Sequence, residues 1–564
     1  MKLSIATAAA LLLSTVIDAK TLLFPIPQDV SWTGAQKSLS SNFKIIGADN
    51  TYVQDASKRY IKLIHKESWV PVQVTPKEHL KQGDTLQSLK IVVKDNKAKL
   101  DLGVDESYIL DVPTKGSQAT LEAKTWVGAL RGLETFAQLV QQGSSKGHLV
   151  AHTAHIKDAP SYPHRGVMLD TARNFYPVKD ILRTIDAMAY NKMNVLHWHI
   201  TDSQSWPIYI KKHPELSKKG AYTPDMVYSP KDVETIIKYG QSRGVRILPE
   251  IDMPAHTDSI ALSHPELMAC HGLWWGTYAA EPPAGQLNVI HPGTIKLVKD
   301  VIKEITSRFP DTLYHAGGDE LNAKCWPTNK QMSDYVKKHK TTFEQVWYDF
   351  TNDIIGYVIK QKKRSIIWED PVKDGGKIKT DTIIQSWVNP PSNYTSAGYD
   401  VIVSNYDYFY LDCGHGGWVG NDTRYISPAQ TQTADDSFNY GGVGGSWCAP
   451  FKTWQRIYSY DMTHGVKKSH KGKVLGGEVA LWSEQSGPTV VDSRLWPRSS
   501  AAAEIYWSGS YDKKGNRRTL GEVQPRFNDW VLRMIGRGIG AEPNTPRWCL
   551  LNPNRCNLNE PSSS

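Results

Sequence analysis

The sequence predicts a (β/α)8 barrel, the TIM-barrel architecture, preceded by a small α+β domain. The main observation is that eight short apolar segments alternate with longer amphipathic stretches in the central and C-terminal parts of the chain. A length of 564 residues, 40% of them hydrophobic, suits one large barrel with an accessory domain. The pattern changes after residues 158–163, a segment with two prolines that is typical of a linker.

The chain divides into four expected parts. Residues 1–19 contain Lys2, an apolar run over 6–16 and the small residue Ala19, which is typical of a secretory signal peptide; the run is too short to span a membrane. Residues 20–160 form the α+β domain, in which short apolar segments lead into a stretch from Trp126 to Val140 with helical spacing. Residues 161–520 form the barrel, and residues 521–564 form a C-terminal helix and a disulfide-tethered tail.

The expected barrel strands are 166–169, 194–200, 245–251, 312–315, 365–368, 382–387, 401–404 and 474–481. Helices are expected between them over 179–190, from Ser229 onward, over 293–308 and over 343–361. The helix after Ser229 has the clearest start, because a capping serine is followed by Pro230 in the first turn and by the acid Asp232.

Two adjacent acids, Asp319 and Glu320, follow the fourth expected strand after a Gly-Gly turn. Chemistry in such barrels belongs at the carboxyl ends of the strands, and successive residues leaving a strand point in different directions. The two carboxyl groups can therefore have different surroundings and different pKa values, as acid–base work on a glycosidic bond requires. A turn before a solvated acidic pair is the competing interpretation, and the other strand ends decide between the two.

Every expected strand end but one carries an ionisable group, and three carry a tryptophan. The residues at the other seven ends are Asp170 with Arg173, Asp202, Asp252 with His256, Trp368 with Glu369, Trp387, Tyr410 with Asp412, and Trp482 with Glu484. Such a lining suits a neutral polyhydroxyl ligand, because carboxylates bind vicinal hydroxyls and indoles stack on sugar faces. We therefore favour the catalytic interpretation. The competing interpretation is structural: Arg173 could form an ion pair with Asp170, and each tryptophan taken alone could belong to the hydrophobic core.

His197-Trp198-His199 suggests a different kind of site. Both imidazoles face the same side of a strand, and with Asp202 they would form the metal site of a barrel hydrolase. The fifth and sixth strands end in Trp368 and Trp387, however, where a metal centre usually draws histidine or lysine. We favour buried, hydrogen-bonded histidines that pack the barrel, so no metal or other cofactor is expected.

Charge and cysteine content bear on partners and compartment. The formal net charge is +9, but lysines and arginines are spread along the chain, which does not indicate a nucleic-acid partner, and no later segment reaches a membrane-spanning length. Six cysteines in an exported protein predict three disulfides, for which fifteen connectivities exist. The simplest joins sequence neighbours: Cys270 with Cys325, Cys413 with Cys448, and Cys549 with Cys556. Sequons at Asn393 and Asn421 fall in expected loops and predict glycosylation.

Several segments together resemble the β-N-acetylhexosaminidases of glycoside hydrolase family 20, and the chain is similar to secreted fungal members over roughly residues 21–550. The segments are HRG (164–166), LDTAR (169–173), HWHITD (197–202), LPEIDMPAH (248–256), HAGGDE (315–320) and LWSE (481–484). The Gly-Gly-Asp-Glu element is the most specific. The resemblance implies a retaining, substrate-assisted mechanism, in which the 2-acetamido oxygen of the substrate attacks the anomeric carbon.

The resemblance also implies a role for each matching position. Glu320 would be the general acid and later the base that activates water, Asp319 would hold the acetamido N–H, and Tyr410 would donate to the acetamido oxygen. The residues implied in substrate binding, with the tryptophans walling an acetyl pocket, are Arg173, Trp368, Trp387, Asp412, Trp482 and Glu484. The resemblance also implies that Asp202, Asp252 and His256 lie behind the residues that contact the substrate, and that Asp202 and His256 adjust the properties of Glu320.

We therefore expect a secreted, exo-acting enzyme that removes terminal N-acetylhexosamine from chitin oligosaccharides or glycans, and the resemblance implies a homodimer. Two alternatives stay open, namely a retaining glycosidase with Asp319 as nucleophile and an inactive barrel that binds chitin oligosaccharides. It is also open whether residues 20–40 include a pro-segment, and whether the insertion 270–287 overhangs the site or an interface.

Overall fold

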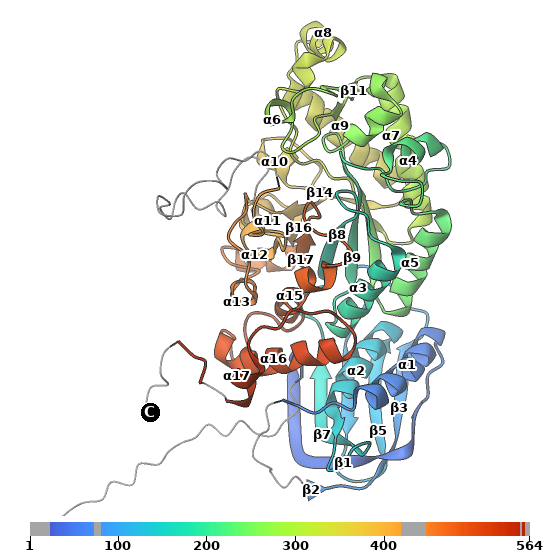
Figure 1. Cartoon of the computed structure of the whole chain (residues 1–564), viewed down its shortest axis with the longest axis vertical. Coiled ribbons are helices and arrows are strands. Elements are labelled where there is room, and N and C mark those ends of the chain that lie inside the picture. Colours follow the sequence, from blue (N-terminus) through green and yellow to red (C-terminus); the bar gives the residue numbers. More distant parts are fainter. Residues whose placement is uncertain (1–22, 73–80, 419–446, 553–554, 559–564) are drawn as a thin grey trace, which may run out of the picture.

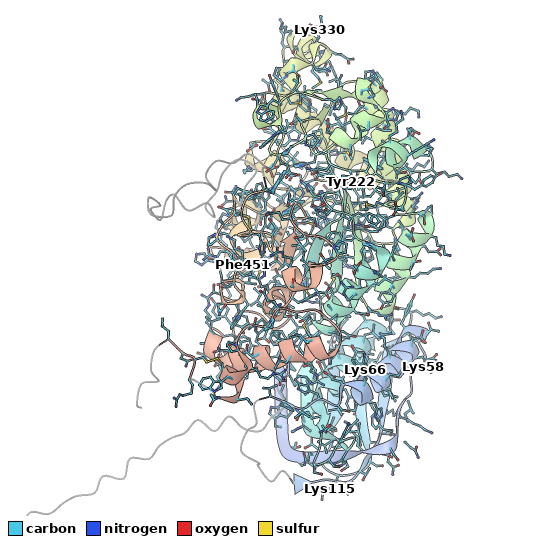
Figure 2. The ribbon with its side chains drawn as sticks, in the orientation of Figure 1. Lys58, Lys66, Lys115, Tyr222, Lys330 and Phe451 are labelled. Atoms are coloured by element: carbon cyan, nitrogen blue, oxygen red, sulfur yellow. A yellow bond between two sulfur atoms is a disulfide. The ribbon has the colours of Figure 1, made fainter. Side chains whose placement is uncertain are left out.

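The computed structural model describes residues 23–72, 81–418, 447–552 and 555–558, which form an N-terminal domain and a larger barrel (Figure 1). The predicted signal peptide and the sequon at Asn421 lie outside these residues. Among the described residues, none of the helices combines the length and the hydropathy that crossing a membrane requires. Figure 2 shows Lys58 and Lys66 close together on the helix Thr51–Glu67, whereas Lys115 and Lys330 lie at opposite ends of the molecule, so these four lysines do not form a single patch.

The N-terminal domain is one mixed sheet covered by two helices. Its elements are β1 (Asp29–Ile46), α1 (Thr51–Glu67), β2 (Lys81–Gln82), β3 (Leu86–Asp95), β4 (Tyr108–Val112), β5 (Gln118–Thr125), α2 (Trp126–Leu139), β6 (Val140–Gln142) and β7 (Leu149–Asp158). The long strand β1 pairs antiparallel with β7 in its first half and parallel with β3 in its second half. Strand β1 thus bridges β3 and β7, and the short strands β2 and β6 are the outermost strands of the sheet.

Buried ion pairs join the N-terminal domain to the barrel. Glu106 accepts hydrogen bonds from Arg131 Nε at 2.8 Å and from Arg165 Nη2 at 2.6 Å. Lys192 Nζ lies 3.0 Å from Asp158 Oδ2 at the end of β7. Removing one partner of such a pair would leave a buried charge uncompensated, at a cost of about 3–5 kcal/mol.

The barrel is closed and consists of eight parallel strands, as the sequence predicts. In chain order the strands are β8 (His164–Asp170), β9 (Val195–Thr201), β10 (Arg246–Ile251), β13 (Leu313–His315), β14 (Arg364–Trp368), β15 (Ile383–Ser386), β16 (Asp400–Val403) and β17 (Val474–Leu481). The predicted helices are found as α3 (Val178–Tyr190), α5 (Pro230–Ser242), α7 (Pro292–Arg308) and α9 (Phe343–Lys360). The capping box at the start of α5 is confirmed, since Ser229 and Asp232 each bond the backbone N–H of the other.

Shorter elements decorate the loops, and one longer helix crosses the junction of the two parts. The helices are α4 (Pro214–Gly220), η1 (Asp258–Leu262), η2 (Pro265–Leu267), α6 (Trp275–Tyr278), η3 (Trp326–Thr328), α8 (Lys330–His339), α10 (Asp370–Lys373), α11 (Pro391–Ser396), α12 (Tyr406–Phe409), α13 (Trp454–Tyr458), η7 (Lys468–Lys473), α14 (Val491–Leu495), α15 (Arg498–Ser508), α16 (Leu520–Gly536) and α17 (Arg547–Leu551). A hairpin of β11 (Met268–Ala269) and β12 (Gln286–Leu287) frames the insertion. Helix α16 lies between the barrel and α2 (Figure 1), where Arg537 bonds Glu134 at 2.8 Å.

The barrel interior is layered along its axis. An apolar cluster comprises Val195, Leu248, Leu313, Ile366, Ile383 and Ile402. A buried polar group comprises His164, His197, His199, Glu250, His315, Gln385 and Glu478. Glu478 bonds His164 and His197, and Glu250 bonds His199, so these polar side chains are paired despite their burial. The residues of the candidate site follow at the carboxyl ends of the strands.

Candidate active site

A cavity of about 410 Å³ opens at the carboxyl ends of the strands and brings most of the predicted site residues together. The predicted residues that line it are Arg173, His256, Asp319, Glu320, Trp387, Tyr410, Asp412, Trp482 and Glu484. Its size is within the range of small-molecule sites, which measure roughly 300–1,000 Å³.

The Gly-Gly turn before the two acids has a specific cause. Gly317 has φ +63°, and a Cβ on it would lie 1.7 Å from Asp252 Oδ1. Asp252 Oδ1 accepts from Gly318 N at 2.8 Å, so this carboxyl group fixes the turn from behind. Glu320 has φ +51°, a left-handed conformation that is uncommon outside glycine. Strain of this kind persists only where the surroundings enforce it, and it is common at active sites.

Asp319 is only 7% exposed, and its carboxyl group lies beside that of Asp252. Burial raises the pKa of Asp319 well above its ordinary value, and the charge of Asp252 raises it further. His256 Nε2, at 3.8 Å from Asp319 Oδ2, acts in the opposite direction. Burial also raises the pKa of Asp252, to about 6. The two carboxyl groups therefore titrate as a pair that retains a proton more strongly than an exposed acid does.

Glu320 has different surroundings and is connected to a chain of charged groups. Its side chain is 34% exposed, and Oε2 lies 3.2 Å from His256 Nε2. His256 Nδ1 lies 3.1 Å from Asp202 Oδ1, and Arg173 Nη1 lies 2.8 Å from Asp202 Oδ2. Burial disfavours a charged imidazole, but Asp202 and Asp319 outweigh it and raise the pKa of His256 well above its ordinary value. The protonated imidazole thus holds the Glu320 carboxyl group in position.

Arg173 is a buried cation surrounded by carboxylates, and it is not only the partner of Asp170. Its Nε donates to Glu281 Oε1 at 2.9 Å and lies 4.0 Å from Glu484 Oε1, whereas the Asp170 carboxylate is 3.5 Å from Nη1. The guanidinium group also lies over the indole of Trp482, 5.0 Å from the ring centroid. It is therefore held rigidly at the wall of the cavity.

Aromatic rings form another part of the cavity wall. Trp387 and Tyr410 are stacked, with ring centroids 6.3 Å apart and an interplanar angle of 11°. The Trp387 indole N–H donates to Asp370 Oδ2 at 2.8 Å, which fixes the ring. Burial raises the pKa of Tyr410 well above its ordinary value, and the charge of Asp319 raises it further, so the Tyr410 hydroxyl stays protonated as a donor.

Trp368 differs from its predicted position in the wall. It is 1% exposed and is not among the residues that line the cavity. Its indole N–H donates to Glu250 Oε1 at 2.8 Å, and its ring packs 5.9 Å from that of Trp482. Trp368 is the last residue of β14, so its side chain points into the barrel and supports Trp482 from behind.

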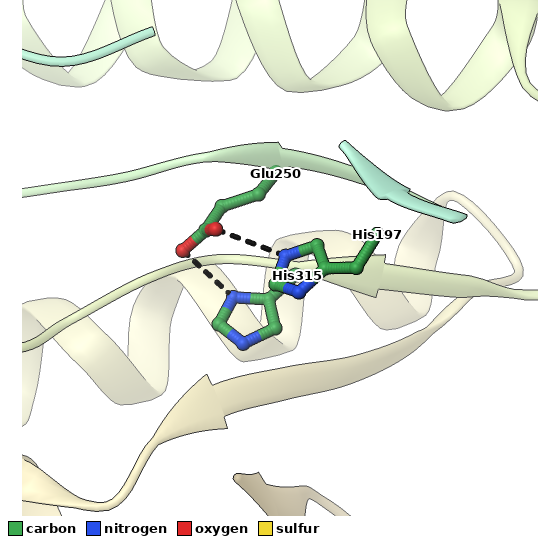
Figure 3. A group of neighbouring side chains, drawn as sticks. All are labelled: His197, Glu250 and His315. Carbon is green, nitrogen blue, oxygen red and sulfur yellow. Dashed lines mark ion pairs between the residues drawn. The ribbon is translucent and has the colours of Figure 1, made fainter. Parts of the chain in front are cut away.

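The histidines of the HWH segment form a hydrogen-bonded network inside the barrel. Figure 3 shows Glu250 between His197 and His315, at 2.9 and 3.0 Å. Glu250 also accepts from His199 at 2.6 Å and from the Trp368 indole at 2.8 Å. One donor therefore bonds each of its two oxygens, since His199 bonds Oε2 and the Trp368 indole bonds Oε1, and an indole N–H cannot coordinate a cation. This arrangement supports the packing interpretation of these histidines.

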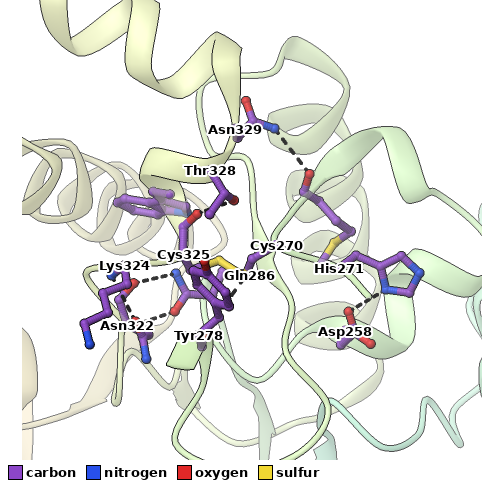
Figure 4. Close-up of a disulfide and its surroundings, with 12 residues drawn as sticks. Asp258, Cys270, His271, Tyr278, Gln286, Asn322, Lys324, Cys325, Thr328 and Asn329 are labelled. Carbon is purple, nitrogen blue, oxygen red and sulfur yellow. Dashed lines mark hydrogen bonds and ion pairs between the residues drawn. A yellow bond between two sulfur atoms is a disulfide. The ribbon is translucent and has the colours of Figure 1, made fainter. Parts of the chain in front are cut away.

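The three described disulfides are Cys270–Cys325, Cys413–Cys448 and Cys549–Cys556, which confirms the pairing of sequence neighbours. The first joins the insertion 270–287 to the loop that follows Glu320 (Figure 4). In that loop Asn322 N donates to Gln286 Oε1 at 2.6 Å. The insertion contributes Trp275 and Glu281 to the cavity lining, so it overhangs the site.

Some lining residues were missed by sequence reasoning. Glu281 and Trp275 belong to the insertion and Trp447 to a loop after β16, so no strand end marks them. Asp370, which holds Trp387, lies two residues beyond the end of β14, and that position was a usable signal.

Asn393 lies in α11 and not in a loop as predicted, but it is exposed, so glycosylation there stays a prediction.

Raised pKa values of buried groups in the barrel make the stability of the protein depend on pH. Burial raises the pKa of Asp412 to about 7 and that of Glu369 to about 7. Burial disfavours the charged form of His197, but Glu478 and Glu250 raise its pKa to about 9. The folded protein thus binds more protons than the unfolded chain above pH 6, and stability falls as pH rises through these values. Histidines with lowered pKa, such as His152, oppose this only below about pH 6.5.

We expect the unfolding temperature to fall as pH rises from 6 to 9, measured by scanning calorimetry at constant ionic strength. Asp412→Asn removes one of the titrating groups and should flatten the part of this slope around pH 7. An unfolding temperature that stays constant or rises over this range would contradict the assigned pKa directions. Asp334→Asn, on the exposed face of α8, is the matched control and should leave the slope unchanged.

Hydrolysis of a glycosidic bond needs carboxyl groups in unlike surroundings, next to surfaces on which a sugar ring can stack. In this cavity Asp319 and Glu320 are the carboxyl groups in unlike surroundings, and Trp387 and Trp482 are the surfaces for stacking. Its place at the carboxyl ends of the barrel strands is that of the active sites of barrel enzymes. The fold and the site together define a glycoside hydrolase.

Comparisons with known proteins give the family. The model described as "Glycosyl hydrolase family 20, catalytic domain" matches residues 162–510, and that described as "beta-acetyl hexosaminidase like" matches residues 23–139. The chain belongs to glycosyl hydrolase family 20, as the resemblance predicts.

Relatives and solved structures agree with this membership. The "Beta-hexosaminidase 1" of Coccidioides posadasii is 38% identical, over 98% of this chain and 98% of that protein. The "Chitooligosaccharidolytic beta-N-acetylglucosaminidase" of Bombyx mori is 35% identical, over 81% of this chain and 76% of that protein. The crystal structure of Flavobacterium johnsoniae chitobiase is similar with a TM-score of 0.73 and 27% identity, over 92% of this chain and 73% of that chain.

Proposed function

We propose that this chain is an exo-acting β-N-acetylhexosaminidase that removes terminal, non-reducing N-acetylglucosamine or N-acetylgalactosamine with retention of configuration. The observation that carries the proposal is the pairing of a buried Asp319, beside the Tyr410 hydroxyl, with a more exposed Glu320 in one aromatic-walled cavity. Buried donors and acceptors suit an acetamido group, and the exposed carboxyl group suits the glycosidic oxygen. The names of the hexosaminidase relatives support the same activity.

In the first step the acetamido oxygen of the substrate attacks the anomeric carbon as the glycosidic C–O bond breaks. Glu320 gives its proton to the leaving oxygen. The proton shared by the Asp319–Asp252 pair then lies on Asp252, so the Asp319 carboxylate accepts from the acetamido N–H and stabilises the positive charge of the oxazolinium intermediate. Tyr410 donates to the acetamido oxygen and aligns it, and such positioning of a reacting group can be worth roughly 7–11 kcal/mol. Asp252 fixes the Gly-Gly turn and raises the pKa of Asp319. His256, which is bonded to Asp202, positions Glu320.

In the second step the Glu320 carboxylate takes a proton from water, and the resulting hydroxide attacks the anomeric carbon. The bond to the acetamido oxygen breaks, and the N-acetylhexosamine leaves with its original configuration. Arg173, Asp412 and Glu484 bind hydroxyl groups of the terminal sugar. Trp387 and Trp482 enclose the acetyl group, and Trp368 supports Trp482 from behind.

The substrates we propose are chitin oligosaccharides or glycans that end in N-acetylhexosamine, in line with the name of the Bombyx mori relative. We also propose that the protein is secreted and glycosylated at Asn393 and Asn421. Three disulfides and the apolar run over 6–16 support export, because disulfides persist in oxidising compartments. A homodimer is proposed from the family resemblance.

A stable thiazoline that mimics the bicyclic intermediate should inhibit far more tightly than free N-acetylglucosamine. Analogues of reactive states bind at least about 10²-fold more tightly than ground-state ligands, because the site is complementary to the former. Competitive inhibition constants for the two compounds, measured at the same pH, test this. Equal affinity would count against an intermediate formed by the acetamido group.

A further inference from the structure

Two copies of the tripeptide His-Pro-Glu meet outside the catalytic cavity. His213-Pro214-Glu215 starts α4 in the loop after β9, and His264-Pro265-Glu266 starts η2 in the loop after β10. Both histidines have nearly the same backbone conformation, with φ −135° and ψ 60° in one and φ −136° and ψ 62° in the other. Their rings approach to 6.3 Å between centroids.

Three potential ligand atoms converge at this point. His213 Nδ1 lies 3.3 Å and His264 Nε2 lies 3.1 Å from the same oxygen, Oε1 of Glu215. All three groups offer ligand atoms within 4.8 Å of one another. In a tetrahedral zinc site with bonds of about 2.0–2.2 Å, neighbouring ligand atoms are about 3.3–3.6 Å apart. The two separations from Glu215 are therefore close to those that such a site requires.

The second nitrogen of each imidazole faces another carboxylate. His213 Nε2 lies 3.3 Å from Asp300 Oδ2 on α7, and His264 Nδ1 lies 3.4 Å from Glu266 Oε1. Histidines that bind metals usually donate their other ring N–H to a carboxylate, which fixes the tautomer and orients the ring. Both histidines thus have a nitrogen directed at Glu215 and a backing carboxylate on the opposite side.

The cluster differs from the buried group His197, Glu250 and His315, which offers ligand atoms at similar spacing. The side chains of the buried group are 0% exposed, and each oxygen of Glu250 already accepts a hydrogen bond, from His199 or from the Trp368 indole. The side chains of His213, Glu215 and His264 are 13%, 34% and 23% exposed. Solvent therefore reaches the second cluster, and Glu215 receives both imidazoles on one oxygen.

We propose that His213, Glu215 and His264 form a Zn²⁺ site, with water as the fourth ligand. Two imidazoles and one carboxylate favour zinc over Mg²⁺ or Ca²⁺, which prefer all-oxygen ligands. The ion would bridge the loops after β9 and β10, whose first residues include Asp202 and His256. It plays no part in the proposed glycosidase chemistry, so a failure of either proposal leaves the other intact.

The test is a titration of untagged, chelator-treated full-length protein with ZnCl₂ at pH 7.5, followed by isothermal calorimetry and by the unfolding temperature. We expect one equivalent of Zn²⁺ to bind, with a rise of the unfolding temperature, and no comparable uptake of Mg²⁺. The double variant His213→Gln/His264→Gln should bind at least about tenfold more weakly. His339→Gln, a change at an exposed histidine on α8, is the control and should bind as the unchanged protein does.

Glu215→Gln keeps both imidazoles and tests the site if the double variant does not fold, which circular dichroism reports. It should also weaken binding at least about tenfold. A crystal soaked in zinc should show anomalous scattering between the three side chains. Absence of a zinc equivalent in the unchanged protein, equal binding by Glu215→Gln, or scattering only elsewhere would each overturn the proposal.

Discussion

Glu320→Gln should lower kcat by about 10²–10⁴-fold on N-acetylglucosaminides with poor leaving groups, with little change in KM. The amide has nearly the same shape and still accepts from His256, 3.2 Å away, so substrate binding and folding are retained. It has no proton to give to the glycosidic oxygen. The measurement is steady-state kinetics on a series of aryl N-acetyl-β-glucosaminides with leaving groups of different pKa.

The dependence on leaving group makes this test specific for a general acid. Substrates with highly acidic phenols need less protonation, so the variant should lose less of the bond-breaking rate on them. Glu344→Gln, on the exposed side of α9, is the matched control and should keep the native rate. If Glu320→Gln keeps full activity on the least reactive substrates, the acid assignment is wrong.

Asp319→Asn should lower the rate on acetamido substrates by about 10²–10³-fold, the usual cost of losing one preorganised charge partner. A neutral amide does not stabilise the positive oxazolinium, and it competes with the acetamido N–H as a donor. We expect the variant to fold, since asparagine also removes the unfavourable proximity of two carboxyl groups at Asp252. Single-turnover rates with a reactive aryl substrate measure the step in question.

Asp334→Asn on α8 controls for the loss of an acidic side chain elsewhere. The unfolding temperature of Asp319→Asn should be at least that of the native protein at pH 7, because burial and Asp252 oppose ionisation of Asp319. A folded Asp319→Asn enzyme with an unchanged rate would argue against charge stabilisation by this residue, and with it against substrate assistance.

The barrel was predictable because each strand and helix carries its own local signal. Apolar runs and amphipathic stretches alternate eight times, and the start of α5 is fixed by Ser229 and Asp232. Strand ends then located Asp319, Glu320 and Tyr410, because closure of a barrel brings all such ends to one side.

The depth of each side chain was not predictable to the same degree. Trp368 is the last residue of β14 and points into the barrel, whereas Trp387 is the first residue beyond β15 and lines the cavity. A difference of one position along the strand decides this, which is finer than the boundaries that a sequence pattern gives. Glu281 reaches Arg173 only through the fold of an insertion, which no periodicity describes.

The position of Glu250 was predictable from the sequence in part only. It lies two residues before Asp252 along β10 and its adjoining loop, so alternation places both side chains on the inner face. The histidines at 197 and 199 share that face of β9 by the same rule. The network of Figure 3 was thus implied by register, although its individual contacts needed the closed barrel.

The most direct test of the central claim compares an aryl N-acetyl-β-glucosaminide with the matching aryl β-glucoside at mildly acidic pH, with and without a chelator. We predict cleavage of the acetamido substrate alone, at a rate that the chelator does not change. Comparable cleavage of both would mean that an enzyme carboxylate is the nucleophile. Cleavage of neither would identify a barrel that binds such sugars without turning them over.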